Sequence, residues 1–532
     1  MPTDPAGDEP GPGGQAGPGG QAAPGDGAAP GGHAAPGDEP APGGQAAPGD
    51  GAGLGLGSRR GRTVLLATIL GSGMAQLDGT VVNVALPRIG RDLDAGLTAL
   101  QWTVNAYSLT LSGLLLLGGS LGDRLGRRRV FTVGVVWFAL ASAGCAAAPN
   151  EAVLIAMRAL QGVGAALLTP GSLAIIQSAF ARDDRAAAVG TWSGLGGIAG
   201  ALGPVVGGLL VGAAPWGWRL VFLINLPLAV LTLVAARAIP EARDRQGPGH
   251  LDVVGAVLAA LGLGGIVYAL TEGPAGGWPV PTVGIGALGA ALLVAFVLQE
   301  IRHRDPLVPP VLFASRDFTA TNAVTLAVYA ALGGAFFLLP LQLQDSVGFS
   351  PVAAGSALLP ITVLLLVLSG PAGRLSTRIG PRLPMTVGPL VAGLGLALFT
   401  RVGPGAGYVS DVLPAVLVFG LGLSLTVAPL TATVMASVAD RYAGVASAVN
   451  NDVARTAGLL AVAVLPALAG IATGGTLDPA RLSAGFDRAV LIAAGLCIAG
   501  GVIAALTVTG RQPSGSSGAP GLRGRPTGGG GS

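Results

Sequence analysis

Residues 64–87 read VLLATILGSGMAQLDGTVVNVALP, with Asp78 as the one charged residue among them. Because an α-helix rises about 1.5 Å per residue, a run of roughly 20 apolar residues crosses the hydrocarbon core of a bilayer, which is roughly 30 Å thick. A helix at the surface of a soluble protein would instead show a polar face along its length. The stretch therefore predicts a helix that spans a membrane.

Apolar runs of similar length recur along the rest of the chain, separated by short polar segments. We expect about fourteen membrane-spanning helices on this criterion. Glycine and proline inside the runs do not argue against helices, because membrane helices tolerate both and use glycine for close packing. The predicted spans are 64–87, 99–121, 130–148, 151–174, 188–213, 219–237, 252–271, 281–300, 318–343, 351–372, 384–401, 411–435, 452–471 and 489–508.

The composition supports an all-α integral membrane protein embedded in a lipid bilayer. Of the 532 residues, 51% are hydrophobic and only 11% are charged, which is too little charge to cover a soluble surface. The net charge of +3 is small and gives no reason to expect a nucleic-acid partner. Cys145 and Cys497 lie in separate apolar runs, so we interpret both as core residues and expect no metal or cofactor.

Two classes of activity lack their sequence signals. Every basic residue apart from the histidines is arginine, so the chain has no phosphate-binding loop with its lysine, which argues against an ATP-driven pump. No nucleophile, histidine and acid come together in a recognisable order, and we therefore do not expect an enzyme. The tails 1–62 and 511–532, rich in Gly, Pro and Ala, are predicted to be disordered because they cannot bury enough apolar surface.

The arginines predict the orientation of the chain. With both termini on one side, 23 arginines, among them Arg455, fall in segments on that side and six fall on the other. Arg158 alone is left inside a predicted span. Because loops rich in arginine stay in the cytoplasm, we expect both termini to be cytoplasmic in a multi-pass protein of the cell membrane.

A repeat divides the chain into two halves. Gly119, Leu121, Arg124, Gly126 and Arg128 recur 254 residues later, and both copies follow an even-numbered predicted helix. Parallel repeats of this kind are a known transporter architecture. We therefore expect a six-helix bundle at 63–240, two linking helices at 241–305 and a second six-helix bundle at 306–510.

Two short motifs lie in the first and fourth predicted helices: residues 77–87 read LDGTVVNVALP, and Arg158 to Gly162 read RALQG. They resemble motifs of one family, the fourteen-helix drug:proton antiporters of the major facilitator superfamily, and residues 77–87 look like its first-helix signature. The resemblance covers nearly everything from Thr63 to Thr509 and implies the major facilitator fold. Two further motifs are similar to the family's loop motif and antiporter signature, and we expect them to gate conformational change: Gly119, Asp123, Arg124, Gly126, Arg127 and Arg128, then Gly200, Gly203, Pro204, Gly207 and Gly208.

The match is not complete. Ala199 precedes Gly200 where the family often has a second glycine, and the second loop copy has Thr377 where Asp123 stands in the first. The acidic role that the resemblance implies for Asp123, a charge relay that locks the bundles together, is therefore not transferred to the second copy.

Asp78 and Arg158 are the predicted proton-coupling residues. Asp78 is the one carboxylate that lies well inside a predicted span, where a charge costs about 2.5–3.5 kcal/mol on insertion scales, so it is a candidate proton carrier. Arg158 cannot lose its charge and needs a carboxylate or a wet cavity. The resemblance implies that the two communicate, and we expect Arg158 to compete with the proton for Asp78. A purely structural ion pair remains the alternative.

Polar residues at helical spacing predict a substrate cavity. Gln101, Asn105, Ser108 and Ser112 form one stripe along the second helix, and Gln76, Thr80 and Asn83 form another along the first. Asp78 is rotated roughly 200° from Gln76 and should face elsewhere. Such stripes could also simply hold helices together. On the ninth predicted helix, Thr325 and Tyr329 follow Thr321 at steps of four and are also predicted to line the cavity. Trp102 and Tyr107 could stack on a planar ligand. Trp102 could equally anchor the second helix at the membrane interface.

The sequence thus predicts a proton-coupled antiporter that exports small amphipathic molecules by alternating access. We expect neutral or monovalent substrates, because predicted helices nine to fourteen show no clear interior carboxylate. A lipid or nutrient facilitator without proton coupling and a membrane sensor that transports nothing remain alternatives.

Overall fold

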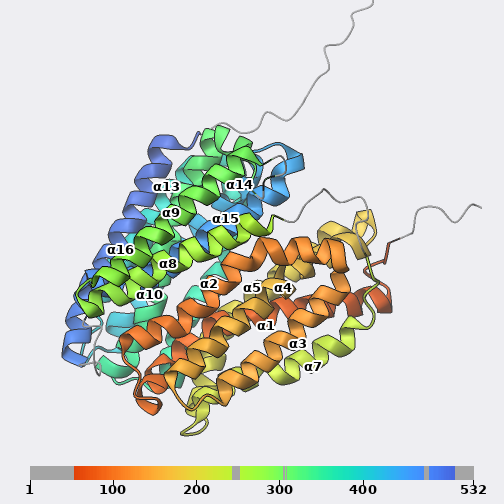
Figure 1. Cartoon of the computed structure of the whole chain (residues 1–532). Helices are drawn as coiled ribbons and strands as arrows, with labels where there is room; N and C mark the ends of the chain where they lie inside the picture. Colours follow the sequence, from red (N-terminus) through yellow and green to blue (C-terminus); the bar gives the residue numbers. More distant parts are fainter. Residues whose placement is uncertain (1–52, 243–251, 304–305, 307, 472–478, 510–532) are drawn as a thin grey trace, which may run out of the picture. The chain divides into compact units, whose positions relative to one another are not determined.

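The computed structural model describes residues 53–471 and 479–509, except 243–251, 304–305 and 307 (Figure 1). Most of the two predicted tails therefore lies outside the described residues. Within these residues every regular element is a helix. The α-helices are α1 (Arg59–Asp92), α2 (Leu97–Leu125), α3 (Arg127–Ala146), α4 (Glu151–Ala179), α5 (Arg182–Gly212), α6 (Leu220–Leu223), α7 (Asn225–Ala236), α8 (Val253–Gly276), α9 (Val280–Arg302), α10 (Arg316–Leu341), α11 (Pro351–Ala357), α12 (Leu359–Ile379), α13 (Arg382–Leu398), α14 (Leu413–Ala436), α15 (Ala443–Leu468) and α16 (Pro479–Thr507).

Thirteen of the described helical spans are long and apolar enough to cross a membrane. Helix α2 is the fourteenth when its segments Leu97–Leu115 and Leu117–Leu125, bent by 51°, are taken as one span. Some spans are built from consecutive elements, for example α11 and α12 over Pro351–Ile379. The predicted all-α membrane architecture is confirmed, although several helices extend beyond their apolar runs: α1 begins at Arg59, before the run 64–87.

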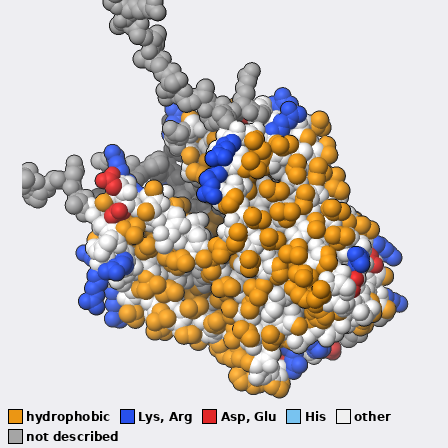
Figure 2. All heavy atoms as spheres, turned by 180° about the vertical axis from the view of Figure 1, so that it is seen from behind, with side chains coloured by type: hydrophobic (Ala, Val, Ile, Leu, Met, Phe, Trp, Pro, Cys, Tyr) orange, Lys and Arg blue, Asp and Glu red, His pale blue; other side chains and the backbone are white. Residues whose placement is uncertain are grey.

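Large apolar side chains cover much of the surface, as expected for helices in contact with lipid. Leu140, Val280 and Leu366 are all more than 60% exposed. Figure 2 shows one face of the molecule on which hydrophobic side chains predominate and most charged ones lie near the margins. The hydrocarbon of a bilayer replaces water over such a surface, so the packed interior forms between the helices rather than beneath a polar shell.

The helices form two bundles. Helices α1–α5 and α7 pack on one another, with α4 between α2 and α3 and with α5 and α7 against α1. Helices α10 and α12–α16 pack in the same way, with α13 against α14 and α16 and with α10 against α15 and α16. Helices α8 and α9 pair with each other, and α8 contacts both α2 and α15. Figure 1 shows the bundles as the red-to-yellow and cyan-to-blue parts of the chain.

The repeated loop motif has the same backbone feature in both bundles. Gly126, between α2 and α3, has φ 108°, and Gly380, between α12 and α13, has φ 85°. Both values lie in the region that only glycine adopts without strain. We call the end of the bundles with these two junctions the arginine-rich face, because it carries Arg127 and Arg382, and we call the other end the opposite face.

The bundles contact each other through the halves of their helices near the opposite face. The Gln101 side chain donates to the Val462 carbonyl at 2.6 Å, and the Gln344 side chain donates to the Val84 carbonyl at 3.0 Å. Helix α5 packs against α11, where a Cβ added to Gly208 would lie 2.5 Å from the Pro351 carbonyl. These contacts close the opposite face. Toward the arginine-rich face, side chains of α5 such as Thr191 and Leu195 are exposed.

Candidate functional site

A buried ion pair joins α1 to α4 inside the first bundle. Nη1 of Arg158 lies 2.5 Å from Oδ2 of Asp78, and the two side chains are 1% and 0% exposed. Arg158 also donates to Oε1 of Gln161 at 2.7 Å and to the Thr103 carbonyl on α2 at 2.9 Å. The guanidinium therefore has oxygen acceptors from three helices.

Amide side chains complete the surroundings of the Asp78 carboxylate. Its Oδ1 accepts hydrogen bonds from Nε2 of Gln161 at 2.8 Å and from Nδ2 of Asn225 at 3.0 Å. Both amides also reach Oγ of Ser142, at 3.1 Å and 3.0 Å, and that hydroxyl donates to the Phe222 carbonyl. Helices α1, α4 and α7 thus meet at one carboxylate, which accepts three hydrogen bonds, and α3 joins them through Ser142.

Aromatic rings enclose the cation. The guanidinium carbon of Arg158 lies 4.2 Å from the centre of the Tyr107 ring and 5.8 Å from that of Phe222. The Tyr107 hydroxyl donates to the Ala75 carbonyl at 3.0 Å, which fixes the ring against α1. A buried cation attracted to ring faces is stabilised by about 2 kcal/mol or more. The ion pair is therefore fully packed and has low access to water.

This arrangement can respond to a single proton. Protonation of Asp78 would remove the charge that balances Arg158 and leave a buried guanidinium without a counter-charge. Removal of one member of a buried ion pair costs about 3–5 kcal/mol, which is enough to favour a different helix packing. The predicted pairing of Asp78 and Arg158 is present in the structure. Among the described residues, no group of three His, Cys, Asp or Glu side chains is placed to hold a metal ion.

Three side chains of this network were not assigned as site residues from the sequence. Gln161 belongs to the helix-four motif that carries the family resemblance, but its spacing from Arg158 does not reveal that it contacts Asp78. Asn225 begins α7 and Ser142 lies in α3, each as a polar residue in an apolar run. A lone polar residue in an apolar run was the only feature of the sequence that could have indicated a role for Asn225 or Ser142.

The predicted stripe of α1 faces α5. The Thr80 hydroxyl donates to the Gly200 carbonyl at 2.9 Å, and Gln76 lies against Gly196 and Gly200. Asp78 lies on another side of α1, as the helical period predicts. Oδ1 of Asn83 is buried and has no hydrogen-bond partner among the described residues.

The stripe of α2 lies along the boundary with the second bundle. Gln101 reaches α15, while Asn105 is fully buried and neither atom of its amide group has a described partner. Oγ of Ser112 is also buried and unpartnered in the described structure, and Ser108 is half-buried. These polar groups are suited to a ligand or to water between the bundles.

The aromatic residues of α2 differ from the prediction. Tyr107 does not present its ring to a ligand, because Arg158 covers one face and the hydroxyl is bonded to α1. Nε1 of Trp102 donates to Oε1 of Glu272 on α8 at 2.7 Å, and its ring lies 6.2 Å from Tyr268. The helical period predicts the direction of each side chain around α2. It does not predict the partners of Trp102 and Tyr107, because these partners lie on other helices.

The predicted residues of α10 partly form a cluster with α15. Oγ1 of Thr325 accepts a hydrogen bond from Nδ2 of Asn450 at 2.7 Å, and the same amide donates to Asn322. Oγ1 of Thr321 is buried without a described partner, and Tyr329 is half-buried.

The predicted gating residues lie in two places. At the arginine-rich face, Arg127 forms a 2.8 Å ion pair with Asp123 and donates to the Ala174 carbonyl at 3.0 Å. Gly119 lies beside Pro170, and Gly126 is the positive-φ junction. Arg124 and Arg128 extend the same arginine cluster. Asp123 is thus paired within its own bundle in this conformation.

The antiporter-like motif holds α5 close to two partners. A Cβ at Gly203 would lie 1.9 Å from Oγ1 of Thr80, and one at Gly207 would lie 2.8 Å from the Val81 carbonyl. Gly208 faces α11, where Gly355 lies against the Pro204 carbonyl. The motif therefore lies at a contact between the bundles, as Pro204 and the neighbouring glycines predict.

One expectation about charge was wrong. Arg455 was counted with the loop arginines although the predicted span 452–471 already contains it, and because α15 begins at Ala443, Asp452 also lies inside a membrane-spanning helix rather than at its edge. The apolar run that predicted the span starts only at residue 452, because the first turns of α15 are polar or small. Asp78 is consequently not the one carboxylate, nor Arg158 the one arginine, within the spans.

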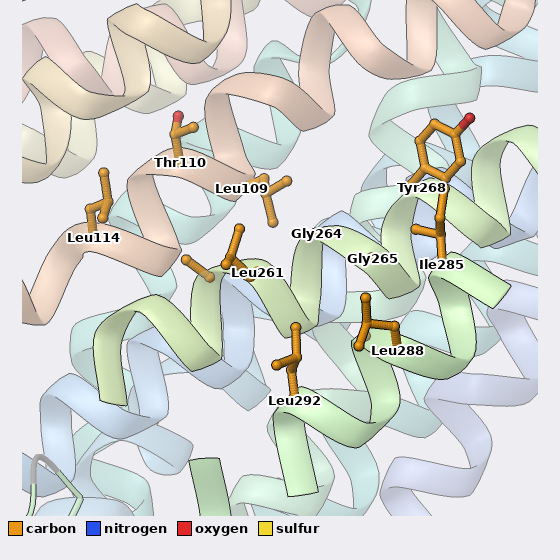
Figure 3. Close-up of a pocket in the computed structure, with 12 residues that line it drawn as sticks. Leu109, Thr110, Leu114, Leu261, Gly264, Gly265, Tyr268, Ile285, Leu288 and Leu292 are labelled. Carbon is orange, nitrogen blue, oxygen red and sulfur yellow. The ribbon is translucent and has the colours of Figure 1, made fainter. Parts of the chain in front are cut away.

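An apolar pocket of about 490 Å³ lies between α2, α8 and α9 (Figure 3). Leu109 and Leu114 of α2 face Leu261 of α8 and Leu288 of α9 across it. It lies beside the polar stripe of α2, and no local pattern in the sequence predicts it because its walls come from distant segments.

Comparisons with known proteins agree with this architecture. A sequence model described as Major Facilitator Superfamily matches residues 68–463. Puromycin resistance protein pur8 of Streptomyces alboniger is 38% identical over 465 residues, which cover 85% of this chain and 91% of that protein. The tetracenomycin C resistance and export protein of Streptomyces glaucescens is 36% identical over 414 residues, covering 77% and 76%. Multidrug resistance protein Stp of Mycobacterium tuberculosis is 34% identical over 422 residues, covering 78% and 77%.

Solved structures show the same fold at low sequence identity. A bacterial homolog of the human lysosomal transporter Spinster has a TM-score of 0.61 at 18% identity and matches 85% of this chain and 97% of that chain. The POT family transporter PepTSo has a TM-score of 0.63 at 17% identity, with 84% and 97% matched. With its helical bundles, its repeated loop junction and resistance and export proteins as relatives, the chain belongs to the major facilitator superfamily and is a membrane transporter rather than an enzyme.

Proposed function

We propose that this transporter is a proton-coupled antiporter that exports small amphipathic drugs or antibiotics across the cell membrane by alternating access. The names of its relatives support drug export: they include a puromycin resistance protein and a tetracenomycin C resistance and export protein. The observation that carries proton coupling is the buried pair of Asp78 and Arg158.

Arg158 and a proton compete for Asp78 in this mechanism. A proton that reaches Asp78 frees the guanidinium, which can no longer stay buried beside a neutral acid without a large cost. The resulting repacking of α1 against α4 changes the angle between the bundles. Loss of the proton on the other side restores the pair and returns the transporter to its first conformation.

The conformation of the structure corresponds to one end of this cycle. The arginine-rich face is the cytoplasmic one by the positive-inside rule, with both termini on the same side. The bundle contacts of Gln101 and Gln344 then close the external side, and substrate enters from the cytoplasm. The polar stripe of α2, where buried atoms of Asn105 and Ser112 have no partner among the described residues, and Tyr329 of α10 receive it.

Transport by purified protein in vesicles with an imposed pH gradient tests the proposal. We expect the wild type to move a fluorescent drug and protons in opposite directions, and Asp78→Asn and Arg158→Ala to lose the coupled flux. Asp94→Asn is the matched control, because Asp94 is exposed and its φ of 50° is one that asparagine tolerates. Undiminished export by Asp78→Asn would point to a facilitator without coupling. A wild type that moves no drug would leave only a sensing role.

A further inference from the structure

A carboxylate and a guanidinium lie unpaired on one helix of the second bundle. Oδ1 of Asp452 is buried and has no hydrogen-bond partner among the described residues. Arg455 follows one turn later on α15, yet no ion pair joins the two among those found in the described structure. Both side chains are half-buried, but Oδ1 of Asp452 is shielded without a hydrogen bond, which is costly for a polar atom. Asp452 and Arg455 therefore differ from Asp78 and Arg158, whose partners are all present.

Both side chains project from the face of α15 that meets the first bundle. At 100° per residue, Asp452 and Arg455 lie within about 80° of Leu459, Val462 and Ala463 around the helix. Val462 and Ala463 accept the hydrogen bonds of Gln101, and Leu459 packs with Ala463 against α8. Asn450, which bonds to α10, lies on a different side. Asp452 and Arg455 thus point toward the boundary between the bundles.

The antiparallel course of α2 and α15 places them opposite the polar stripe of α2. Because Gln101 donates to the carbonyls of both Val462 and Ala463, Arg455 is level with Ser108 and Leu109, and Asp452 is level with Leu111 and Ser112. Buried polar atoms of Asn105 and Ser112 lack described partners on the α2 side. Buried polar atoms without a described partner thus lie on both α2 and α15 at this level.

We propose that Asp452 and Arg455 form a dipolar recognition site for substrates that carry a protonated amine and, about one helical turn away, a carbonyl or phenolate oxygen. The amine binds the Asp452 carboxylate and the oxygen binds the Arg455 guanidinium. The rise of about 1.5 Å per residue sets the Cα atoms roughly 4.5 Å apart along the axis, which matches compact drugs. This inference rests on the proposed export function and narrows its substrate class from neutral or monovalent molecules to amines with an acceptor.

Matched drug pairs in the proteoliposome assay test the site. The probes are doxorubicin and puromycin, each with its N-acetylated derivative, which lacks the amine charge, and chloramphenicol as a drug without an amine. We expect the wild type to export both parent drugs roughly tenfold or more better than their N-acetyl forms, as expected for one charge-assisted hydrogen bond. Asp452→Asn should abolish this preference. Arg455→Gln should weaken export of the parent drugs but leave the preference for the amine.

A charge-moving variant separates recognition from folding. In Asp452→Asn combined with Asn451→Asp, the helix keeps one carboxylate but presents it about 100° away, so the preference should not return. Retained export of any N-acetylated drug or of chloramphenicol shows that a variant is folded. Equal export of parent and N-acetyl drugs by the wild type, or an unchanged preference in Asp452→Asn, overturns the site. Export confined to drugs without an amine also overturns it, whereas no export of any drug by the wild type instead refutes the proposed function.

Discussion

Replacing the members of the Asp78 and Arg158 pair singly and together should give strongly non-additive losses of stability. Asp78→Asn keeps the shape of the side chain but leaves Arg158 with only neutral acceptors, Gln161 and the Thr103 carbonyl. Arg158→Gln leaves the Asp78 carboxylate with the amides of Gln161 and Asn225. Each single change strands one buried charge.

The size of the effect follows from burial. Both side chains are at most 1% exposed, so water cannot solvate the stranded charge, and each single variant should lose about 3–5 kcal/mol. The double variant carries no charge at the site and replaces the pair by amides. We therefore expect it to be more stable than either single variant, with an interaction energy of roughly 3 kcal/mol, at the upper end of those measured for contacting residues.

Thermal unfolding in detergent, followed with a thiol-reactive dye, measures this ranking. Cys145 and Cys497 are free and buried, so the dye reports the opening of both bundles. Sγ of Cys145 lies 3.7 Å from Oε1 of Gln161 and so samples the site itself. Asp94→Asn serves as the control and should unfold like the wild type. Strictly additive losses, or single variants as stable as the wild type, would refute the view that the two charges depend on each other.

Three further outcomes are expected. Gly203→Ala should cost about 1–3 kcal/mol in the same unfolding assay, because its Cβ would lie 1.9 Å from Oγ1 of Thr80, whereas Gly197→Ala meets nothing within 4 Å and should be tolerated. Gly126→Ala, at φ 108°, should lose about 1–2 kcal/mol, and an equal loss in the helical Gly122→Ala would contradict a backbone origin. If one proton is exchanged for each substrate, export of a monovalent cation should not respond to a membrane potential, while export of a neutral drug should respond with about 2.3 kcal/mol per 100 mV, measured with an imposed potassium diffusion potential.

The fold was predictable because hydrocarbon imposes strict limits on sequence. A helix in a bilayer must satisfy its own backbone and present apolar side chains over a fixed thickness, so length and hydropathy suffice to locate most spans. The run 64–87 and its counterparts met both conditions. Gly126 and Gly380 marked equivalent junctions because the repeat requires glycine at a positive φ in both halves.

The limits of helices were less predictable. Hydropathy located the span 452–471 but did not predict that the helix begins at Ala443. Small and polar residues can continue a helix once it packs against neighbouring helices. Asp452, the first residue of the predicted span, consequently lies well inside α15. Hydropathy averaged over neighbouring residues measures how apolar a segment is. It contains no information about the distant helices that bury the polar end of that segment.

By itself, the sequence determined the helical membrane class and the repeat, and it indicated that Arg158 needs a carboxylate or a wet cavity. The family resemblance implied that Asp78 and Arg158 form a pair. Only the tertiary structure decided which amides, rings and carbonyls surround that pair, that Tyr107 serves Arg158, and that Asp452 and Arg455 remain unpaired at the bundle boundary. The physical reason is that a helical period specifies the direction of a side chain around its own axis. The partner in that direction depends on how distant helices pack.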